Sequence, residues 1–304
     1  MSPVDVYQQV TDRIIAALEA GTVPWRKPWT GGGPVNVRTG RLYRGINVFL
    51  LEMMGHTDPR WGTYKAIRES GGYVRKGEHG TQIILGKRVQ KRRSPHAEPG
   101  EQELDDSYFL LRFYKVFNAE QCNEVPPLND APEFEPLERA ESIIYGYPGP
   151  TISIGGGEAS YSETTDIVRC PAPEHFPVRD NYYATLYHEL VHSTGHKDRL
   201  ARLESTGFGT SPYAKEELVA EMGAAMLCGI AGLDPHIEQS AAYIENWLQR
   251  LQGDRKFVVQ AARFAQGACD HMLGTKFEES NGSNGSNGSE DYQEADNRKE
   301  VVPA

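Results

Sequence analysis

The stretch YYATLYHELVHSTGH, residues 182–196, constrains this chain more than any other. Two histidines, His188 and His192, lie four positions apart, and Glu189 directly follows the first of them. Apolar neighbours and the following Gly195 predict an α-helix that ends at the glycine. Because positions i and i+4 share one face of a helix, both imidazoles can bind the same cation. Glu189 can then accept a proton from water at that cation without binding the metal itself, which is the zincin arrangement.

Two histidines do not complete such a site, and two candidates for the third ligand follow closely in the sequence. His196 comes eight residues after His188, but Gly195 is expected to end the helix first. Asp198 completes the pattern H-x-x-x-H-x-x-G-x-x-D, in which the third ligand follows a glycine turn. Asp198 is therefore an alternative metal ligand.

A third candidate lies in a second predicted helix, AKEELVAEMGAAMLCGIAG, residues 214–232. Glu217 and Glu221 are one turn apart in this alanine-rich helix, whereas Glu216 is expected to occupy an exposed position. Neighbouring like charges destabilise a helix, and buried carboxylates are costly unless they are paired. A cation between the two helices removes both difficulties, so we predict Glu217 as the third metal ligand. Glu221 would then be the carboxylate that orients a histidine N–H.

The donor set of two histidines and one glutamate indicates which metals would bind. Zn²⁺ binds imidazole nitrogen and carboxylate oxygen, and three protein ligands are typical of its catalytic sites. Other divalent ions, such as Mn²⁺, bind similar donors. The sequence therefore predicts Zn²⁺ as the cofactor, with another divalent metal as the alternative.

Charge is distributed unevenly along the chain. The 304 residues have a formal net charge of −10 at pH 7. Residues 1–96 contain 16 Lys and Arg against 7 Asp and Glu, a net charge of +9, so the remaining 208 residues carry −19. Such asymmetry indicates two functional units, a basic one followed by an acidic one.

The basic unit interleaves cations with aromatic residues. Cations neutralise phosphates and aromatic rings stack on exposed bases, so this composition favours single-stranded nucleic acid as a partner. No helix-turn-helix or zinc-finger spacing indicates that duplex sequence is read. The alternative is a solvated basic face over a few core aromatic residues, for which Trp61 and Tyr64 are candidates. The residues predicted to bind DNA are Trp25, Arg26, Lys27, Trp29, Arg38, Arg41, Arg44, Lys65, Arg75 and Lys76.

The order of predicted helices, strands and loops favours an α+β fold with two domains. We predict a basic mixed α/β domain at residues 1–125, a linker at 126–136 and a metal-binding domain at 137–277. Residues 278–304 contain NGS repeats, cannot bury apolar surface and are predicted to be disordered. The four cysteines are scattered without a CxxC pair, which indicates a reducing compartment. No apolar run is long enough for a transmembrane helix, and the first residues lack an export signal, so no membrane partner is expected.

Two groups of motifs resemble one known family. YYATLYHELVHSTGH, together with EELVAEMGAAML, resembles the zincin-like metallopeptidase domain of ArdC-type antirestriction proteins. The same domain also occurs near the amino terminus of some conjugative plasmid primases. The single-stranded-DNA-binding domain of that family is similar to DVYQQVTDRIIAALEAGTVPWRKPW, GRLYRGINVFLL, WGTYKAIRESGGYVRKGEHGTQIIL and YKVFN. The resemblance covers residues 4–275. It implies a mixed α/β DNA-binding domain before a zincin-like metallopeptidase domain, and it carries the gluzincin ligand role onto Glu217.

The resemblance also implies a function. A bacterial, cytoplasmic protein of this family would bind single-stranded DNA and protect incoming plasmid DNA from host restriction during conjugation, including in the recipient cell. Its acidic domain would hydrolyse a peptide bond in a protein substrate, with Glu189 as general base. The alternative is a non-proteolytic single-stranded-DNA-binding protein whose metal site is structural or vestigial. A primase fragment is disfavoured, because no carboxylate cluster for nucleotidyl transfer follows the metal motif.

Two further features bear on how a peptidase would hold its substrate. The stretch SYSETTDIVRCP, residues 160–171, could accept a peptide as an added strand, and an ordinary structural strand is an equally supported alternative. Tyr182, Tyr183 and Tyr213 are candidate donors to a developing oxyanion, and the sequence does not choose among them.

Overall fold

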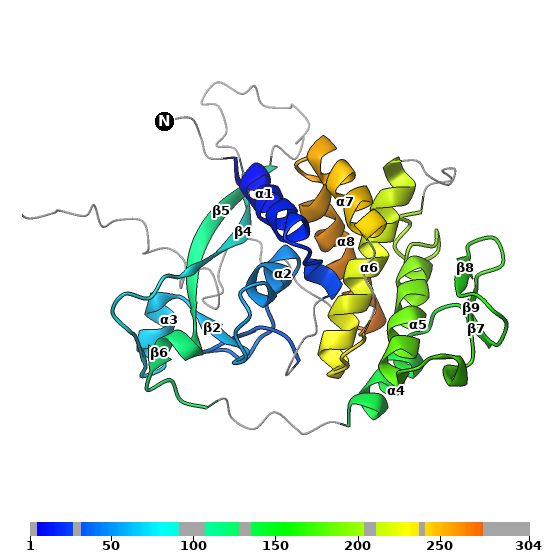
Figure 1. Cartoon of the computed structure of the whole chain (residues 1–304), viewed down its shortest axis with the longest axis horizontal. Helices are drawn as coiled ribbons and strands as arrows, with labels where there is room; N and C mark the ends of the chain where they lie inside the picture. The colour runs from blue at the N-terminus through cyan, green and yellow to red at the C-terminus, as the bar shows by residue number, and fades with distance from the viewer. Residues whose placement is uncertain are drawn as a thin grey trace, which may run out of the picture.

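A computed structural model describes most of the chain, namely residues 5–26, 32–90, 107–127, 135–203, 211–236 and 241–275. A region of strands and short helices adjoins a helical region that carries a small sheet of its own (Figure 1). The mixed α+β class predicted from the sequence is confirmed. The predicted tail, 278–304, lies outside the described residues. None of the described helices is both long and apolar enough to cross a bilayer.

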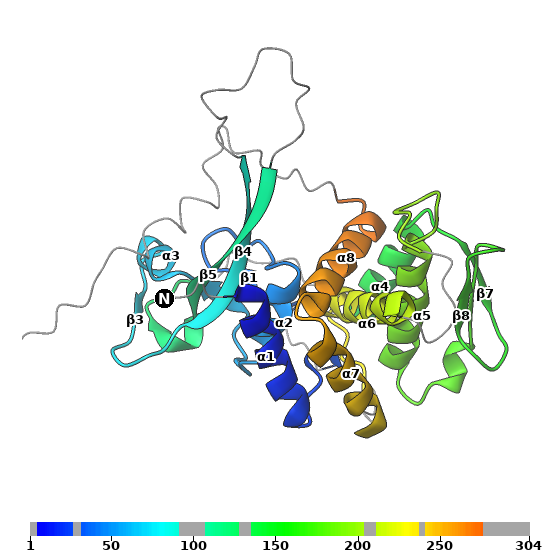
Figure 2. The ribbon, with the colours of Figure 1, turned by 90° about the horizontal axis from the view of Figure 1, so that it is seen from above.

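The amino-terminal region is built on a four-stranded sheet in the order β1-β2-β5-β4. β1 and β2 are parallel, and the other neighbours are antiparallel. The long β4–β5 hairpin keeps one register from Thr81 opposite Val116 to Gln90 opposite Ser107. It extends away from the rest of the molecule in the view from above (Figure 2). The strand bounds are β1 Val35–Asn36, β2 Arg60–Gly62, β4 Thr81–Gln90 and β5 Ser107–Asn118.

Two helices pack between this sheet and the helical region. α1 (Val6–Glu19) begins at Asp5, whose side chain accepts the Gln8 N–H, and its fully buried residues recur with helical spacing, as expected for an amphipathic helix. α2 (Ile46–Glu52) is apolar along most of its length. The smaller elements of this region are η1 (Pro24–Arg26), α3 (Tyr64–Glu69), β3 (Tyr73–Val74), η2 (Ala119–Gln121) and β6 (Cys122–Asn123), with β3 and β6 paired antiparallel.

The helical region is organised around α6, which packs against α5 on one side and α8 on the other. Close approach of α5 and α6 depends on Gly223, because a Cβ there would lie 2.8 Å from Cγ2 of Val191. The two helices therefore lie near enough for side chains of moderate length to meet between them. The bounds are α4 Pro136–Gly146, α5 Arg179–Thr194, α6 Ser211–Ala231, α7 Ala241–Gly253 and α8 Phe257–Met272.

A three-stranded sheet lies beside α5, in the order β7-β9-β8. β7 (Thr151–Ile154) is parallel to β9 (Ile167–Cys170), and β8 (Ser160–Ser162) is antiparallel to it. β8 is an edge strand of this sheet, which leaves one of its edges available to another strand. The short helix η3 (Pro173–His175) leads from β9 into α5.

One hydrophobic core extends through both regions. The buried face of α1 and most of α2 belong to the same cluster as α5, α6 and α8. Trp25 follows α1 and is 2% exposed, with its ring edge-on to Trp247 of α7 at a centroid distance of 5.9 Å. The first and last thirds of the chain therefore bury apolar surface against each other. The predicted linker, 126–136, joins two regions that are held together by this packing as well as by the chain.

Candidate metal centre

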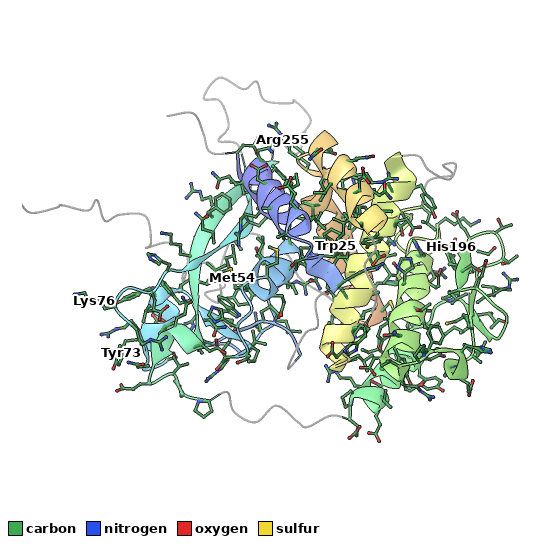
Figure 3. The ribbon with its side chains drawn as sticks, in the orientation of Figure 1. Trp25, Met54, Tyr73, Lys76, His196 and Arg255 are labelled. Atoms are coloured by element: carbon green, nitrogen blue, oxygen red, sulfur yellow. The ribbon has the colours of Figure 1, made fainter. Side chains whose placement is uncertain are left out.

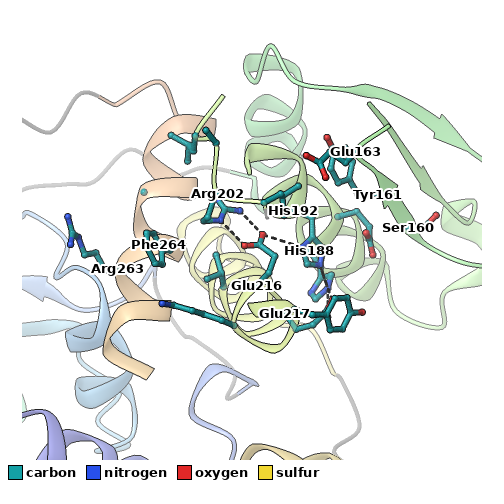
Figure 4. A pocket seen from close by; sticks show the side chains of 18 of the residues that line it. Ser160, Tyr161, Glu163, His188, His192, Arg202, Glu216, Glu217, Arg263 and Phe264 are labelled. Atoms are coloured by element: carbon teal, nitrogen blue, oxygen red, sulfur yellow. Dashed lines mark hydrogen bonds and ion pairs between the residues drawn. The ribbon is translucent and has the colours of Figure 1, made fainter. Parts of the chain in front are cut away.

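The helix predicted around the two histidines is α5, and it ends with Gly195 as its C-cap. His188 and His192 lie on the face that meets α6, with their Nε2 atoms 3.1 Å apart (Figure 4). The ring planes are nearly perpendicular, at 81°, with centroids 4.8 Å apart. The i, i+4 spacing therefore brings two imidazole nitrogens to one point, as the sequence predicts.

Glu217 of α6 reaches the same point from the opposite helix. Its Oε2 atom lies 3.6 Å from Nε2 of His188, and its Oε1 atom lies 3.6 Å from Nε2 of His192. One ligand atom from each of the three residues lies within 4.8 Å of the others. Donors about 2.0–2.1 Å from a tetrahedral metal are roughly 3.3 Å apart, so the three side chains have the spacing that a Zn²⁺-sized cation requires.

The electrostatics of these three side chains also favour a cation. Burial by itself would raise the pKa of Glu217, but the hydrogen bond from His188, the charges of both histidines and the Tyr213 hydroxyl lower it to about 2. Burial opposes a charge on His188, yet the hydrogen bond to Glu217 and neighbouring carboxylates raise its pKa. The surroundings that favour a proton on this imidazole are equally suited to a divalent metal ion.

A cavity of about 1110 Å³ gives access to the three side chains. Its walls come from β8, from α6, from α8 and from the segment that follows α5. Glu189 lines the cavity and is only 9% exposed, next to His188 in the sequence and on the same helix. Tyr213 also lines it, and burial together with the Glu217 carboxylate raises the pKa of its phenol to about 12, so the hydroxyl stays protonated and can donate. A carboxylate and a hydrogen-bond donor therefore share one cavity with the three candidate ligands.

The two nearby candidates for the third ligand lie outside this cluster. Asp198 has a side chain that is 74% exposed, and its backbone N–H donates to Nδ1 of His196 over 3.2 Å. His196 is 8% exposed, and it lies in the turn after α5. The cluster that the described residues form contains Glu217 and neither Asp198 nor His196.

Glu216 does not occupy the exposed position that the sequence suggests. Its side chain is 13% exposed, and its Oε1 atom lies 3.4 Å from Nδ1 of His192. Arg202 donates to both of its oxygens, from Nε over 2.8 Å and from a terminal nitrogen over 2.7 Å. Burial would raise the pKa of Glu216, but the hydrogen bonds from Arg202 and His192 lower it. Sequence reasoning missed both Glu216 and Arg202, because adjacent positions on a helix do not normally face the same site.

Glu221, predicted to orient a histidine, has a different partner in its described hydrogen bonds. It accepts from Nε of Arg26 over 3.2 Å and from a terminal nitrogen of Arg26 over 2.6 Å. The guanidinium also lies 3.9 Å from the ring centroid of Tyr243. Glu221 still contributes negative potential to His188. Its bidentate partner comes from the amino-terminal region, so this ion pair joins the two parts of the chain.

The residues predicted to bind DNA separate into two groups, and the first lies between the two regions. Trp25 is buried, and its Nε1–H donates to the hydroxyl of Tyr243, so its ring packs in the core of the described structure. Arg26 is paired with Glu221. Arg44 is paired with Asp270 of α8. These side chains hold the two regions together, which propensity and charge alone could not reveal. Lys27 and Trp29 lie outside the described residues.

The second group lies around α3 and β3, at the end of the molecule far from α5 (Figure 3). The side chains of Arg38, Lys65 and Arg75 are 35%, 41% and 42% exposed. Two aromatic residues accompany the cations: Tyr64, a candidate core residue in the alternative interpretation, is 57% exposed, and Tyr73 is 37% exposed. Trp61 is buried, as expected for the core. We call this group the α3 surface, and its residues are Arg38, Arg41, Tyr64, Lys65, Tyr73, Arg75 and Lys76.

Comparison with known proteins matches two successive segments of the chain to two families. Residues 4–117 match the family described as the N-terminal domain of anti-restriction factor ArdC, and residues 138–264 match a zincin-like metallopeptidase family. Two crystal structures of antirestriction ArdC protein from plasmid R388 are similar to the chain. The Mn(II)-bound one has 38% identity and a TM-score of 0.71, covering 89% of this chain and 98% of that one. The metal-free one has 36% identity and a TM-score of 0.72, covering 90% and 100%.

Curated relatives point the same way. The chain is 39% identical over 285 residues to a DNA primase TraC of Escherichia coli, which covers 88% of this chain but 27% of the primase. It therefore spans about a quarter of that relative's length. It is also 36% identical over 285 residues to the uncharacterized protein y4eC of Sinorhizobium fredii, covering 89% of this chain and 92% of that protein. With its two domains, its fold and these relatives in agreement, the chain belongs to the ArdC family of antirestriction proteins.

Proposed function

We propose that this protein counteracts restriction by binding single-stranded DNA and by hydrolysing peptide bonds at a divalent metal centre. The observation that carries the peptidase half is the convergence of His188, His192 and Glu217 in a cavity that also contains Glu189. A closed structural site would have no need of a carboxylate base beside it or of a cavity of this size. The site of action would be the bacterial cytoplasm, including that of a recipient cell during conjugation.

The three ligands are suited to Zn²⁺, and Mn²⁺ is the other candidate because the R388 protein was crystallised with Mn(II). When bound, either cation would supply Lewis acidity toward water and toward the carbonyl of a substrate. The chain supplies the other groups. Glu189 accepts the proton of the attacking water and passes it to the leaving amine. Tyr213 presents a protonated hydroxyl to the cavity, where it can donate to developing negative charge.

The β8 edge is the natural position for a peptide substrate. Ser160, Tyr161 and Glu163 line the cavity, and the backbone of β8 is paired on one side with β9. An extended peptide can add to the other side of such a strand through main-chain hydrogen bonds. Arg199 fixes the hairpin of β8 and β9 against α5, since it donates to Asp166, to the hydroxyl of Tyr161 and to the carbonyl of Ser193. The substrate would therefore meet a rigid edge.

The α3 surface supports the DNA-binding half of the proposal. Its cations are exposed and two tyrosine rings lie among them, which suits a flexible strand whose bases can unstack. The surface lies at one end of the molecule and α5 at the other (Figure 3). This separation also favours a second candidate function, in which the protein shields DNA without proteolysis and the metal site is structural.

One substitution separates the two functions. Glu189→Gln removes the base while leaving all three candidate ligands in place, so metal content and DNA binding should persist. If proteolysis is the mechanism, the rate of hydrolysis should fall by about 10²–10⁴-fold, and protection of incoming plasmid DNA in recipient cells should be lost with it. The matched control is Glu174→Gln, which changes an exposed glutamate of η3 and should protect as well as the unmodified protein. Full protection by Glu189→Gln would establish the non-proteolytic function, and proteomes of recipients carrying either form would reveal the substrate.

A further inference from the structure

His192 lies between two consecutive carboxylates of α6. Its Nε2 atom faces Glu217, and its Nδ1 atom lies 3.4 Å from Oε1 of Glu216 (Figure 4). Successive residues of a helix are rotated by about 100°, so neighbours normally point in different directions. Here that rotation places one carboxylate on each side of a single imidazole ring. Each ring nitrogen of His192 therefore has an acidic partner of its own.

Arg202 fixes the Glu216 carboxylate in a two-pronged ion pair. Nε and a terminal nitrogen of the guanidinium each donate to one carboxylate oxygen, over 2.8 and 2.7 Å. The two side chains are only 8% and 13% exposed. A planar fork of this kind fixes both the position and the plane of the carboxylate, which a lysine could not do.

Arg202 is in turn fixed to the C-terminal end of α5. Its terminal nitrogens donate to the hydroxyl of Thr194 over 3.0 Å and to the carbonyl of Val191 over 2.9 Å. Its backbone N–H donates to the carbonyl of Gly195 over 2.9 Å. A Cβ at position 195 would lie 2.8 Å from Cγ of Leu203, so this close return of the chain favours glycine. The arginine thus satisfies carbonyls at a helix end where a positive charge is also favourable.

We propose that Glu216, held by Arg202, is a positioning residue of the metal centre. Glu216 accepts the Nδ1–H of His192, which selects the tautomer whose Nε2 lone pair points toward Glu217. It touches neither metal nor substrate and acts only through the ring. The role that the sequence suggested for Glu221 would therefore belong to Glu216 on the His192 side. This inference rests on the proposed metal centre and adds to it the residues that orient one ligand.

The test is zinc binding to the complete chain, measured by calorimetric titration of the chelator-treated protein with ZnCl₂. Glu216→Gln should lower the affinity by about 10–100-fold, the usual effect of removing a carboxylate behind a histidine ligand. Arg202→Lys, which keeps the charge but loses the fork, should lower it in the same direction. Asp166→Asn is the matched control, because it breaks another arginine–carboxylate pair at the same end of α5 and should leave the affinity unchanged.

A second measurement needs no variant. In the chelator-treated unmodified protein with ¹⁵N-labelled histidine, the neutral ring of His192 should carry its proton on Nδ1, and a proton on Nε2 would overturn the proposal. Unchanged zinc affinity in the folded variants Glu216→Gln and Arg202→Lys would also overturn the proposal. Failure of the unmodified protein to bind zinc or Mn²⁺ would instead remove the metal centre on which the proposed function depends. The two failures are therefore distinguishable.

Discussion

The metal centre and the α3 surface use charge in opposite ways. Around His192 the charged side chains are largely buried, with Glu216 and Arg202 at 13% and 8% exposure, and each has a fixed partner. On the α3 surface Lys65 and Arg75 are 41% and 42% exposed, and their acidic partners, Glu69 and Glu78, are 40% and 27% exposed. Buried charges are costly to desolvate and need partners at set distances, so they define one geometry. Exposed cations act over longer distances, are screened by salt and are individually replaceable. The first arrangement suits binding of one small ion, and the second suits binding of a flexible polyanion.

The largest expected effect is at Glu217. Zinc binds zinc-finger peptides with about 10–16 kcal/mol, so an equal share for one of three protein ligands corresponds to a loss of about 10²–10⁴-fold in binding. Glu217→Ala should therefore lose its metal on dialysis, and elemental analysis of the dialysed protein would measure this. Asp198→Ala is the matched control and should retain about one equivalent of metal. If Asp198→Ala loses the metal and Glu217→Ala keeps it, Asp198 is the ligand. The metal would then be bound by an exposed side chain, and the contrast with the α3 surface would fail.

The cluster of His188, His192 and Glu217 was more predictable from the sequence than the α3 surface, for a physical reason. The placement of His188 and His192 follows from helix geometry within five residues. The choice of Glu217 follows from the cost of unpaired carboxylates in an apolar helix. Burial of Trp25 depends on Trp247, more than two hundred residues away, and nothing near Trp25 in the sequence encodes it. The environment of Glu216 likewise depends on Arg202, which reaches it only because the chain turns back at Gly195.

Arg26 provides an intermediate case, because its ion pair with Glu221 is largely buried but joins the two regions. Arg26→Met leaves the Glu221 carboxylate without its bidentate partner and removes the cation from the Tyr243 ring. Removing one partner of a buried pair costs about 3–5 kcal/mol, and we expect the lower end because the side chains are 13% and 15% exposed. The free energy of unfolding in urea, measured on chelator-treated protein, should fall by that amount.

The matched control for Arg26 is the double variant Arg26→Met with Glu221→Met. Replacing both partners with apolar side chains of similar size removes the uncompensated charge, so most of the lost stability should return. Equal stability of the single variant and the unmodified protein would mean that this pair behaves like an exposed one. The contrast between buried and exposed charge would then apply only at the metal centre itself.

The smallest expected effects are on the α3 surface, where a ring and a cation should act differently. Tyr64→Ala should weaken single-stranded-DNA binding by about tenfold, the low end of the contribution of one stacked base. Its dependence on salt should stay unchanged, because no phosphate contact is lost. Lys76→Gln should weaken binding less at moderate salt, and the slope of log affinity against log salt concentration should become shallower by about 0.7. Fluorescence anisotropy of a labelled oligonucleotide across a salt series would measure both.

The control for this pair is Tyr145→Ala, which removes a tyrosine that is 83% exposed on α4 in the other region. Its DNA affinity and salt slope should equal those of the unmodified protein, since an exposed ring outside the α3 surface has no base to contact. If Tyr145→Ala weakens binding as much as Tyr64→Ala, the bases stack elsewhere or on several surfaces at once. If Lys76→Gln leaves the salt slope unchanged, its ammonium does not contact a phosphate, and the α3 surface would lose the polyanion-binding role that distinguishes it from the metal centre.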